Sequence, residues 1–73
     1  MIKNNRPKTC IINVEYPINK EGWIRVISIE AKTKREFELK YAGVVLALTE
    51  VLGISDSDIT IGLFALNNHK WFQ

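Results

Sequence analysis

The chain has little of the chemistry on which most catalytic sites depend. It contains one cysteine, Cys10, and one histidine, His69, in 73 residues. A single cysteine excludes an intramolecular disulfide and a cysteine-based zinc site. Because the two residues fall on predicted strands near opposite ends of the chain, a Cys/His catalytic pair would require them to meet by chance. We therefore expect a small core thiol, a histidine beside a turn, and a protein that is not an enzyme.

The four glycines are scattered along the chain, and no phosphate-binding G-x-G-x-x-G or G-x-x-x-x-G-K-[ST] motif occurs. Glu36 and Glu38 occupy alternate positions of a predicted strand, which is typical of a solvated face. The acidic segment from Ser55 to Asp58 lacks the twelve-residue loop and terminal glutamate of an EF-hand, so it indicates a turn. The sequence predicts neither a cofactor nor a metal.

No apolar run approaches the roughly 18 residues of a membrane span, and the N-terminal residues lack an apolar h-region. The single cysteine gives no sign of an oxidising compartment. We expect a cytoplasmic protein with no membrane partner. Residues 1–8 are polar and basic and are predicted to be a mobile tail, and residues 9–73 are predicted to be one domain.

Tyr41 to Gly53 is the segment that most clearly predicts a helix. On a wheel of 100° per residue its larger apolar side chains fall in a stripe of about 120°, as in a helix packed on a core. Gly53 suits the left-handed conformation that ends a helix, and Ile54 can fold back on Leu48. The opposite side is small and weakly polar, with Leu46 as its one large apolar residue. The inward residues would be Tyr41, Val44, Val45, Leu48, Val51 and Leu52.

The remaining segments are β-branched and bounded by turns, which favours strands. In the third predicted strand, Phe37 and Leu39 would point inward. The order strand, strand, strand, helix, strand, strand predicts an α+β domain with a single, mainly antiparallel sheet and one helix packed on one face. In a β-grasp-like alternative, the third segment is only an extended lead into the helix. The predicted strands are Thr9 to Tyr16, Trp23 to Glu30, Arg35 to Lys40, Ile59 to Leu66 and His69 to Phe72.

This fold leaves more apolar residues than one helix can cover. Asn67 and Asn68 would form a hairpin turn that places Phe64 opposite Trp71. These aromatics and Leu66 would then lie on the uncovered face of the sheet. Large exposed apolar patches are uncommon on monomers, and a twofold dimer is the commonest remedy. We therefore expect a non-enzymatic interaction or assembly module that forms a homodimer or binds another protein.

Two dimer geometries fit the sequence. One packs the uncovered sheet faces together. The other packs the backs of two helices, where Gly43 and Ala47, four residues apart, let the backbones approach around Leu46. The predicted interface residues are Phe64, Leu66, Trp71 and Leu46.

The alternative function is weak nucleic-acid binding by a basic surface. It would use the N-terminal tail and the turn over residues 31–35, and Trp23 would offer a stacking platform. Glutamates flank that turn, and the formal net charge of +2 is low for this function. Protein binding is therefore the favoured hypothesis. The basic residues of the alternative are Lys3, Arg6, Lys8, Lys32, Lys34 and Arg35.

Overall fold

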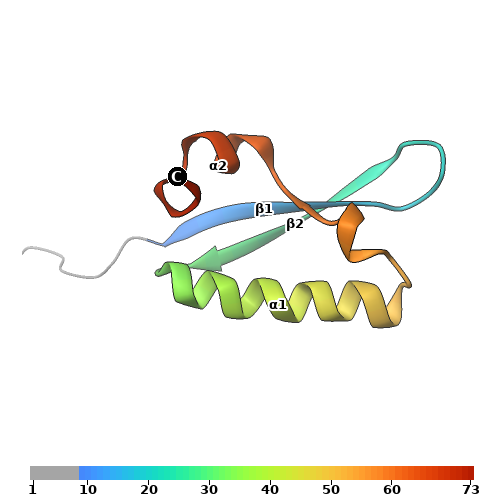
Figure 1. The fold of residues 1–73 in the computed structure, drawn as a ribbon, viewed down its shortest axis with the longest axis horizontal. Coiled ribbons are helices and arrows are strands. Elements are labelled where there is room, and N and C mark those ends of the chain that lie inside the picture. The colour runs from blue at the N-terminus through green and yellow to red at the C-terminus, as the bar shows by residue number, and fades with distance from the viewer. Residues whose placement is uncertain (1–8) are drawn as a thin grey trace, which may run out of the picture.

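Two long antiparallel strands and one long helix form the frame of the molecule (Figure 1). The computed structural model describes residues 9–73. Strand β1 spans Cys10–Pro17, strand β2 spans Ile24–Ala31 and helix α1 spans Lys34–Val51. The two strands pair from Cys10 opposite Ala31 to Pro17 opposite Ile24. An α+β domain with an antiparallel sheet and one main helix is therefore confirmed, although the order of its elements differs from the predicted one.

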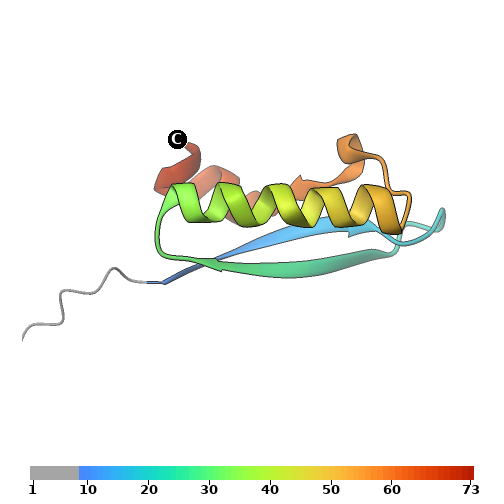
Figure 2. The same cartoon turned by 90° about the horizontal axis from the view of Figure 1, so that it is seen from below.

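The C-terminal part of the chain consists of short elements. They are the 3-10 turn η1 (Asp56–Asp58), strand β3 (Thr60–Ile61), helix α2 (Leu63–Asn68) and the 3-10 turn η2 (Lys70–Phe72). Strand β3 pairs antiparallel with β1, so the sheet has the order β2-β1-β3. Figure 2 shows that α1 and the C-terminal elements lie on the same side of the long hairpin, with α1 in front and α2 behind it.

The core lies between this helical side and the inward face of the sheet. Strand β1 contributes its alternate residues Ile12, Val14 and Tyr16, all buried, as its period of two predicts. Helix α1 contributes Phe37 and Leu48. No helix within residues 9–73 covers the opposite face of the hairpin, and Ile11, Ile24 and Val26 are exposed there. The buried core residues are Ile12, Val14, Tyr16, Ile29, Ala31, Phe37, Leu48, Ile59 and Ala65.

Helix α1 begins at Lys34, well before the predicted start at Tyr41. The strand predicted over Arg35 to Lys40 is therefore wrong, and so is the extended lead of the β-grasp-like alternative. The reason is a cap: Thr33 Oγ1 accepts the N–H of Glu36 at 3.1 Å, which satisfies one of the free donors at a helix start. The Glu36 carboxylate reaches back and accepts the Lys32 N–H at 2.7 Å.

The predicted end of the helix is confirmed. Gly53 takes a φ of +67°, a left-handed conformation that glycine adopts without steric cost. The N–H of Ile54 then donates to the carbonyl of Leu48 at 3.1 Å. Tyr41, Val44 and Val45 pack against the core as predicted, together with the buried Leu48, but Val51 and Leu52 are exposed. The predicted inward stripe therefore holds from Tyr41 to Leu48 and is wrong at the C-terminal end of the helix.

The strand predicted over Ile59 to Leu66 is present only at Thr60–Ile61. Gly62 approaches β1 closely: its N–H donates to the Asn13 carbonyl at 2.9 Å, and an added Cβ would lie 3.1 Å from Glu15 Oε2. After this contact the chain leaves the sheet and turns into α2. The strand prediction is wrong beyond Ile61 because the β-branched residues end there, and Gly62 and Ala65 belong to the residue types that are depleted in strands.

The predicted C-terminal hairpin is also wrong. Asn68 Nδ2 donates to the Phe64 carbonyl at 3.0 Å, and the His69 N–H donates to the Ala65 carbonyl at 2.8 Å. These bonds close a helical turn through the two asparagines, in place of the expected hairpin turn. Phe64 and Trp71 therefore lie on α2 and η2, and not opposite each other on paired strands.

Candidate protein-interaction surface

One side of α1 carries large apolar side chains that the core does not use. Leu39 is 65% exposed and Leu46 is 56% exposed. They are seven residues apart, about two helical turns, so they share one side of the helix. We define the outer face of α1 by six residues that fall within an arc of about 100°. They are Arg35, Leu39, Ala42, Gly43, Leu46 and Glu50.

The side of α1 opposite its outer face already supplies the core. Phe37, Tyr41, Val44 and Leu48 recur at helical spacing, and all are buried or packed against buried residues. The core therefore uses one apolar side of this helix, and Leu39 and Leu46 form a second apolar side that the core does not use. Leu39 was predicted to point inward from a strand, and the start of the helix at Lys34 turns it to solvent.

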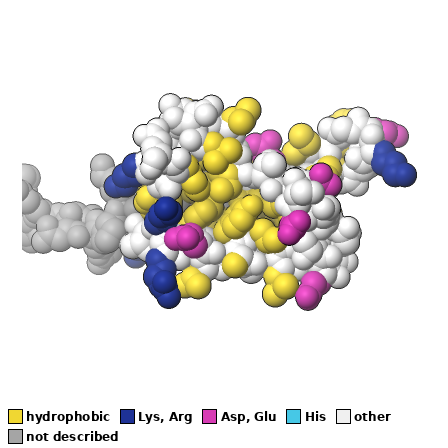
Figure 3. Space-filling model, in the orientation of Figure 1, with side chains coloured by type: hydrophobic (Ala, Val, Ile, Leu, Met, Phe, Trp, Pro, Cys, Tyr) yellow, Lys and Arg dark blue, Asp and Glu magenta, His cyan; other side chains and the backbone are white. Residues whose placement is uncertain are grey.

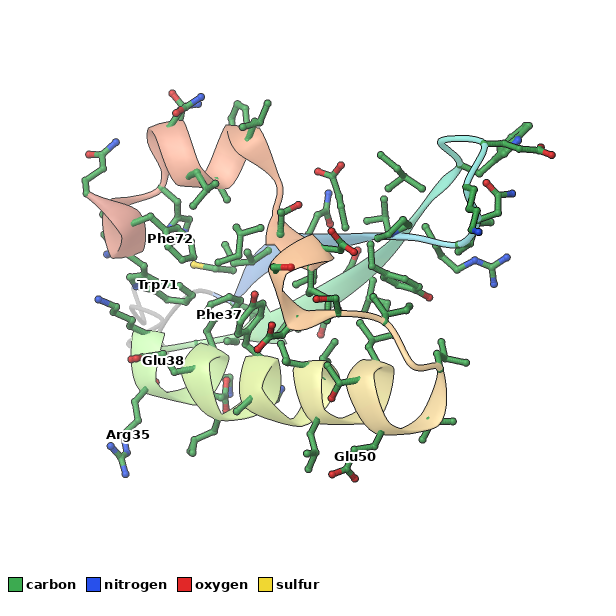
Figure 4. The ribbon with its side chains drawn as sticks, turned by 45° about the vertical axis from the view of Figure 1, so that its right-hand side comes forward. Arg35, Phe37, Glu38, Glu50, Trp71 and Phe72 are labelled. Carbon is green, nitrogen blue, oxygen red and sulfur yellow. The ribbon has the colours of Figure 1, made fainter. Side chains whose placement is uncertain are left out.

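The middle of the outer face is flat and its ends are charged. Ala42 and Gly43 are exposed, and a Cβ built on Gly43 meets no atom within 4 Å beyond its chain neighbours and the local helix backbone. Arg35 lies in the first turn and Glu50 in the last, both exposed. Figure 4 shows these two side chains on the same side of α1, pointing away from the strands and from the C-terminal elements. Leu39 and Leu46 thus project from a smooth surface between two opposite charges.

A shallow groove of about 560 Å³ borders this surface, between α1 and the free edge of β2. Its helical wall includes Gly43, which has no side chain, and Ala47, which has only a methyl group, so this wall leaves the groove open. At one end Lys40 Nζ donates to the carbonyl of Glu30 at 2.7 Å. A lysine that occupies an edge carbonyl obstructs strand addition there. The groove is therefore not an open site for an added strand, but it leaves space next to the outer face of α1.

Helix α2 carries a second exposed apolar surface. Phe64 is 82% exposed and Leu63 is 72% exposed, and Leu66 is less so. In Figure 1 this helix and α1 lie on opposite flanks of the molecule, and Figure 2 agrees. Figure 3 shows hydrophobic side chains in the space between the two flanks, with Lys and Arg side chains toward the two ends of the molecule. A single flat contact cannot cover both helices.

Trp71 holds the C-terminal end of the chain on the core. Its ring centroid lies 6.1 Å from that of Phe37 and 4.5 Å from that of His69. Phe72 meets Phe37 edge-on at 5.5 Å (Figure 4). His69 Nδ1 accepts the N–H of Trp71 at 3.1 Å, so this histidine caps η2. The aromatic cluster stabilises the packing of η2 on α1.

The predicted interface residues therefore do not form one surface. Leu46 lies on the outer face of α1, Phe64 and Leu66 lie on α2, and Trp71 is half-buried beside Phe37. The sheet-face dimer requires the last three on an open sheet face, and that arrangement is absent because residues 63–68 are helical. The dimer that packs the backs of two helices still has its predicted contact surface, because Leu46, Gly43 and Ala47 are exposed on α1.

The basic residues of the alternative hypothesis are only partly described. Lys32 precedes α1, and Lys34 and Arg35 lie in its first turn, all exposed. Lys3, Arg6 and Lys8 lie outside the described residues. The carboxylate of Glu36 already accepts a backbone N–H beside this basic group. It places a negative charge where a phosphate would otherwise find donors.

Within residues 9–73 no group of three or more His, Cys, Asp or Glu residues could hold a metal ion. In the same part of the chain every buried side-chain nitrogen or oxygen has a hydrogen-bond partner. Neither α1 nor the other helices there combine the length and hydropathy needed to cross a bilayer. The described surface is therefore distinguished mainly by its apolar residues.

Two sequence signals could have located the outer face of α1. Thr33 and Glu36 fit the S/T-x-x-E pattern of a capping box, which places a helix start at Lys34. The inward stripe also continues from Tyr41 back to Phe37 at helical spacing. Together they put Leu39 on the outside. The alternation of apolar and charged residues over Arg35 to Lys40 also fits a strand, and this pattern led to the wrong prediction.

Comparison with known proteins gives no independent indication of function. No protein-family model, no curated protein and no solved structure matches the chain.

Proposed function

We propose that this chain is a small, non-enzymatic assembly module that forms a homodimer through the outer face of α1. The observation that carries the proposal is the pair of exposed leucines, Leu39 and Leu46, on a helix whose other side already packs on the core. Burying apolar side chains contributes about 25 cal/mol per Å² of surface removed from water. A second copy that covers both leucines gains this free energy without any change of fold.

The shape of the helix surface supports the same contact. Ala42 and Gly43 are exposed and small, so two helices can approach closely between the leucines. An 18-residue helix is about 27 Å long. One helix pair of this length gives an interface near the lower end of the specific size range, and the dimer is therefore expected to depend on protein concentration.

Phe64 and Leu66 on α2 are proposed as a separate contact for another protein. They lie on the flank away from α1, so the homodimer leaves them free. Trp71 is proposed to support this contact indirectly, because it fixes η2 on Phe37 next to α2.

Sedimentation velocity over a concentration series tests the homodimer. The wild type should shift from monomer to dimer as concentration rises, and Leu46→Glu should remain monomeric because it buries a charge in the contact. Phe64→Glu is the matched control, since it makes the same change on α2 and should leave the dimer intact. A wild type that is monomeric at all concentrations would reject the homodimer.

Weak nucleic-acid binding stays the second candidate, since Lys32, Lys34 and Arg35 gather exposed at one end of α1. Phosphate contacts are strongest at low salt and weaken steeply as salt rises. Gel-shift assays with single- and double-stranded oligonucleotides at low salt therefore test it. Retention that disappears in a triple Lys32→Glu, Lys34→Glu, Arg35→Glu variant would support this candidate, and no retention of the wild type would reject it.

A further inference from the structure

The residues on the outer face of α1 are arranged symmetrically about the middle of the face. Leu39 precedes Ala42 by three residues, and Leu46 follows Gly43 by three. Farther out, Arg35 precedes Ala42 by seven residues and Glu50 follows Gly43 by seven. Leucine thus mirrors leucine, and a positive charge mirrors a negative one, about the point between Ala42 and Gly43.

We infer that two copies of α1 pack antiparallel, with a twofold axis between Ala42 and Gly43, so that Arg35 of each copy pairs with Glu50 of the other. This inference rests on the proposed homodimer and specifies its geometry. In the same register Leu39 of each copy meets Leu46 of the other, and the small residues lie at the axis. A parallel pair would instead bring Arg35 against Arg35 and Glu50 against Glu50.

The signs of the two charges provide an independent argument. A helix carries a partial positive charge at its N-terminus and a partial negative charge at its C-terminus. Arg35, in the first turn, and Glu50, in the last turn, each have the wrong sign for their own end of α1. In an antiparallel pair, Arg35 lies beside the C-terminal end of the second helix and Glu50 beside its N-terminal end. Both charges are then favourably placed.

The surroundings of the two residues leave them available for this contact. Both are exposed, and both point to the side of α1 away from the strands (Figure 4). The negative charge that suits the start of α1 is provided by Glu36, whose carboxylate bonds to the backbone before the helix. Arg35 is therefore not required for capping, and its position on the outer face is explained by a partner.

Charge reversal tests the register. In a homodimer, Arg35→Glu sets the new carboxylate against Glu50 at both ends of the interface, and Glu50→Arg sets the new guanidinium against Arg35 at both ends. Each single variant should therefore dimerise at least about tenfold more weakly than the wild type, because like charges meet twice. An equimolar mixture should recover dimer formation, because a heterodimer of the two variants can pair the new carboxylate of one chain with the new guanidinium of the other. Its second end pairs the native Arg35 with the native Glu50.

These variants should still fold, because each reversal gives α1 the charge that its own end favours. Circular dichroism of each variant checks this directly. Lys34→Glu and Glu38→Arg are the matched controls, since they change the same charges on α1 outside its outer face. Their mixture should show no preference for heterodimers. Sedimentation velocity, with one variant fluorescently labelled, measures all of these states.

Disulfide trapping provides a second readout, with Cys10 replaced by alanine in every variant. Leu39→Cys and Leu46→Cys should cross-link when mixed, because the register brings these positions together. Leu39→Cys alone should not, because its two copies would be about 10 Å apart along the helix axes, beyond the Cα separation of a disulfide.

The outcomes separate this inference from the proposed function. A dimer that Leu46→Glu dissociates, but that the mixed charge variants do not restore, would overturn the antiparallel register and leave the homodimer in place. Single charge variants that dimerise as tightly as the wild type would also overturn the register. A wild type that is monomeric at every concentration would overturn both.

Discussion

The ring of Phe37, in the first turns of α1, lies 6.1 Å from the ring of Trp71, near the C-terminal end of the chain. This contact joins segments that are more than thirty residues apart in the sequence. Because of this contact, the Trp71 side chain packs against the core and is only partly exposed to solvent. The fold of residues 63–72 therefore depends on contacts with α1 in addition to its own local hydrogen bonds.

Trp71→Ala should lower the free energy of unfolding by roughly 2 to 3 kcal/mol, because a half-buried aromatic loses its contacts with Phe37 and His69. Urea denaturation followed by circular dichroism measures this loss. Phe64→Ala is the control: its side chain is 82% exposed, and its effect should stay within about 0.5 kcal/mol. Equal effects from the two substitutions would contradict the packing of η2 on α1.

Thr33→Ala should cost about 1 kcal/mol, since the Glu36 N–H loses the hydroxyl oxygen that caps the helix. Thr33→Ser keeps the oxygen and should retain most of the stability. The same denaturation experiment compares the two variants. If alanine and serine behave alike, the cap contributes nothing to the start of α1.

Gly43→Ala should stabilise the monomer by about 0.5 to 1 kcal/mol. Glycine inside a helix costs this much relative to alanine, and beyond its chain neighbours and the local helix backbone the added methyl group meets no atom within 4 Å. Thermal unfolding at low protein concentration measures the change. A bulkier Gly43→Leu should instead weaken the proposed dimer, which sedimentation at high concentration detects.

Gly53→Ala should have the opposite sign to Gly43→Ala. Gly53 has a φ of +67°, where a Cβ is disfavoured, so alanine should destabilise the fold by about 1 kcal/mol. Gly53→Asn should cost less, because asparagine tolerates this conformation better. Thermal unfolding of the two variants provides the comparison, and a stabilising alanine would contradict the helix end at this residue.

The β-hairpin and the end of α1 could be predicted because their signals are local. Alternating apolar residues such as Ile12 and Val14 define the inward face of a strand without reference to other segments. Gly53 marks a helix end by its own conformational freedom. The start of α1 could also have been located from Thr33 and Glu36, but the alternation of charged and apolar residues around Phe37 favours a strand equally well.

The order of residues alone determines the α+β class, the two long strands, the end of α1 at Gly53 and the part of its inward stripe from Tyr41 to Leu48. Packing between distant segments decides which apolar residues remain outside. Leu39 is exposed because the helix continues back to Lys34. Trp71 is half-buried because η2 folds onto Phe37. Such burial depends on the tertiary fold, since a short apolar run fits a strand or a helix until its packing partner is present.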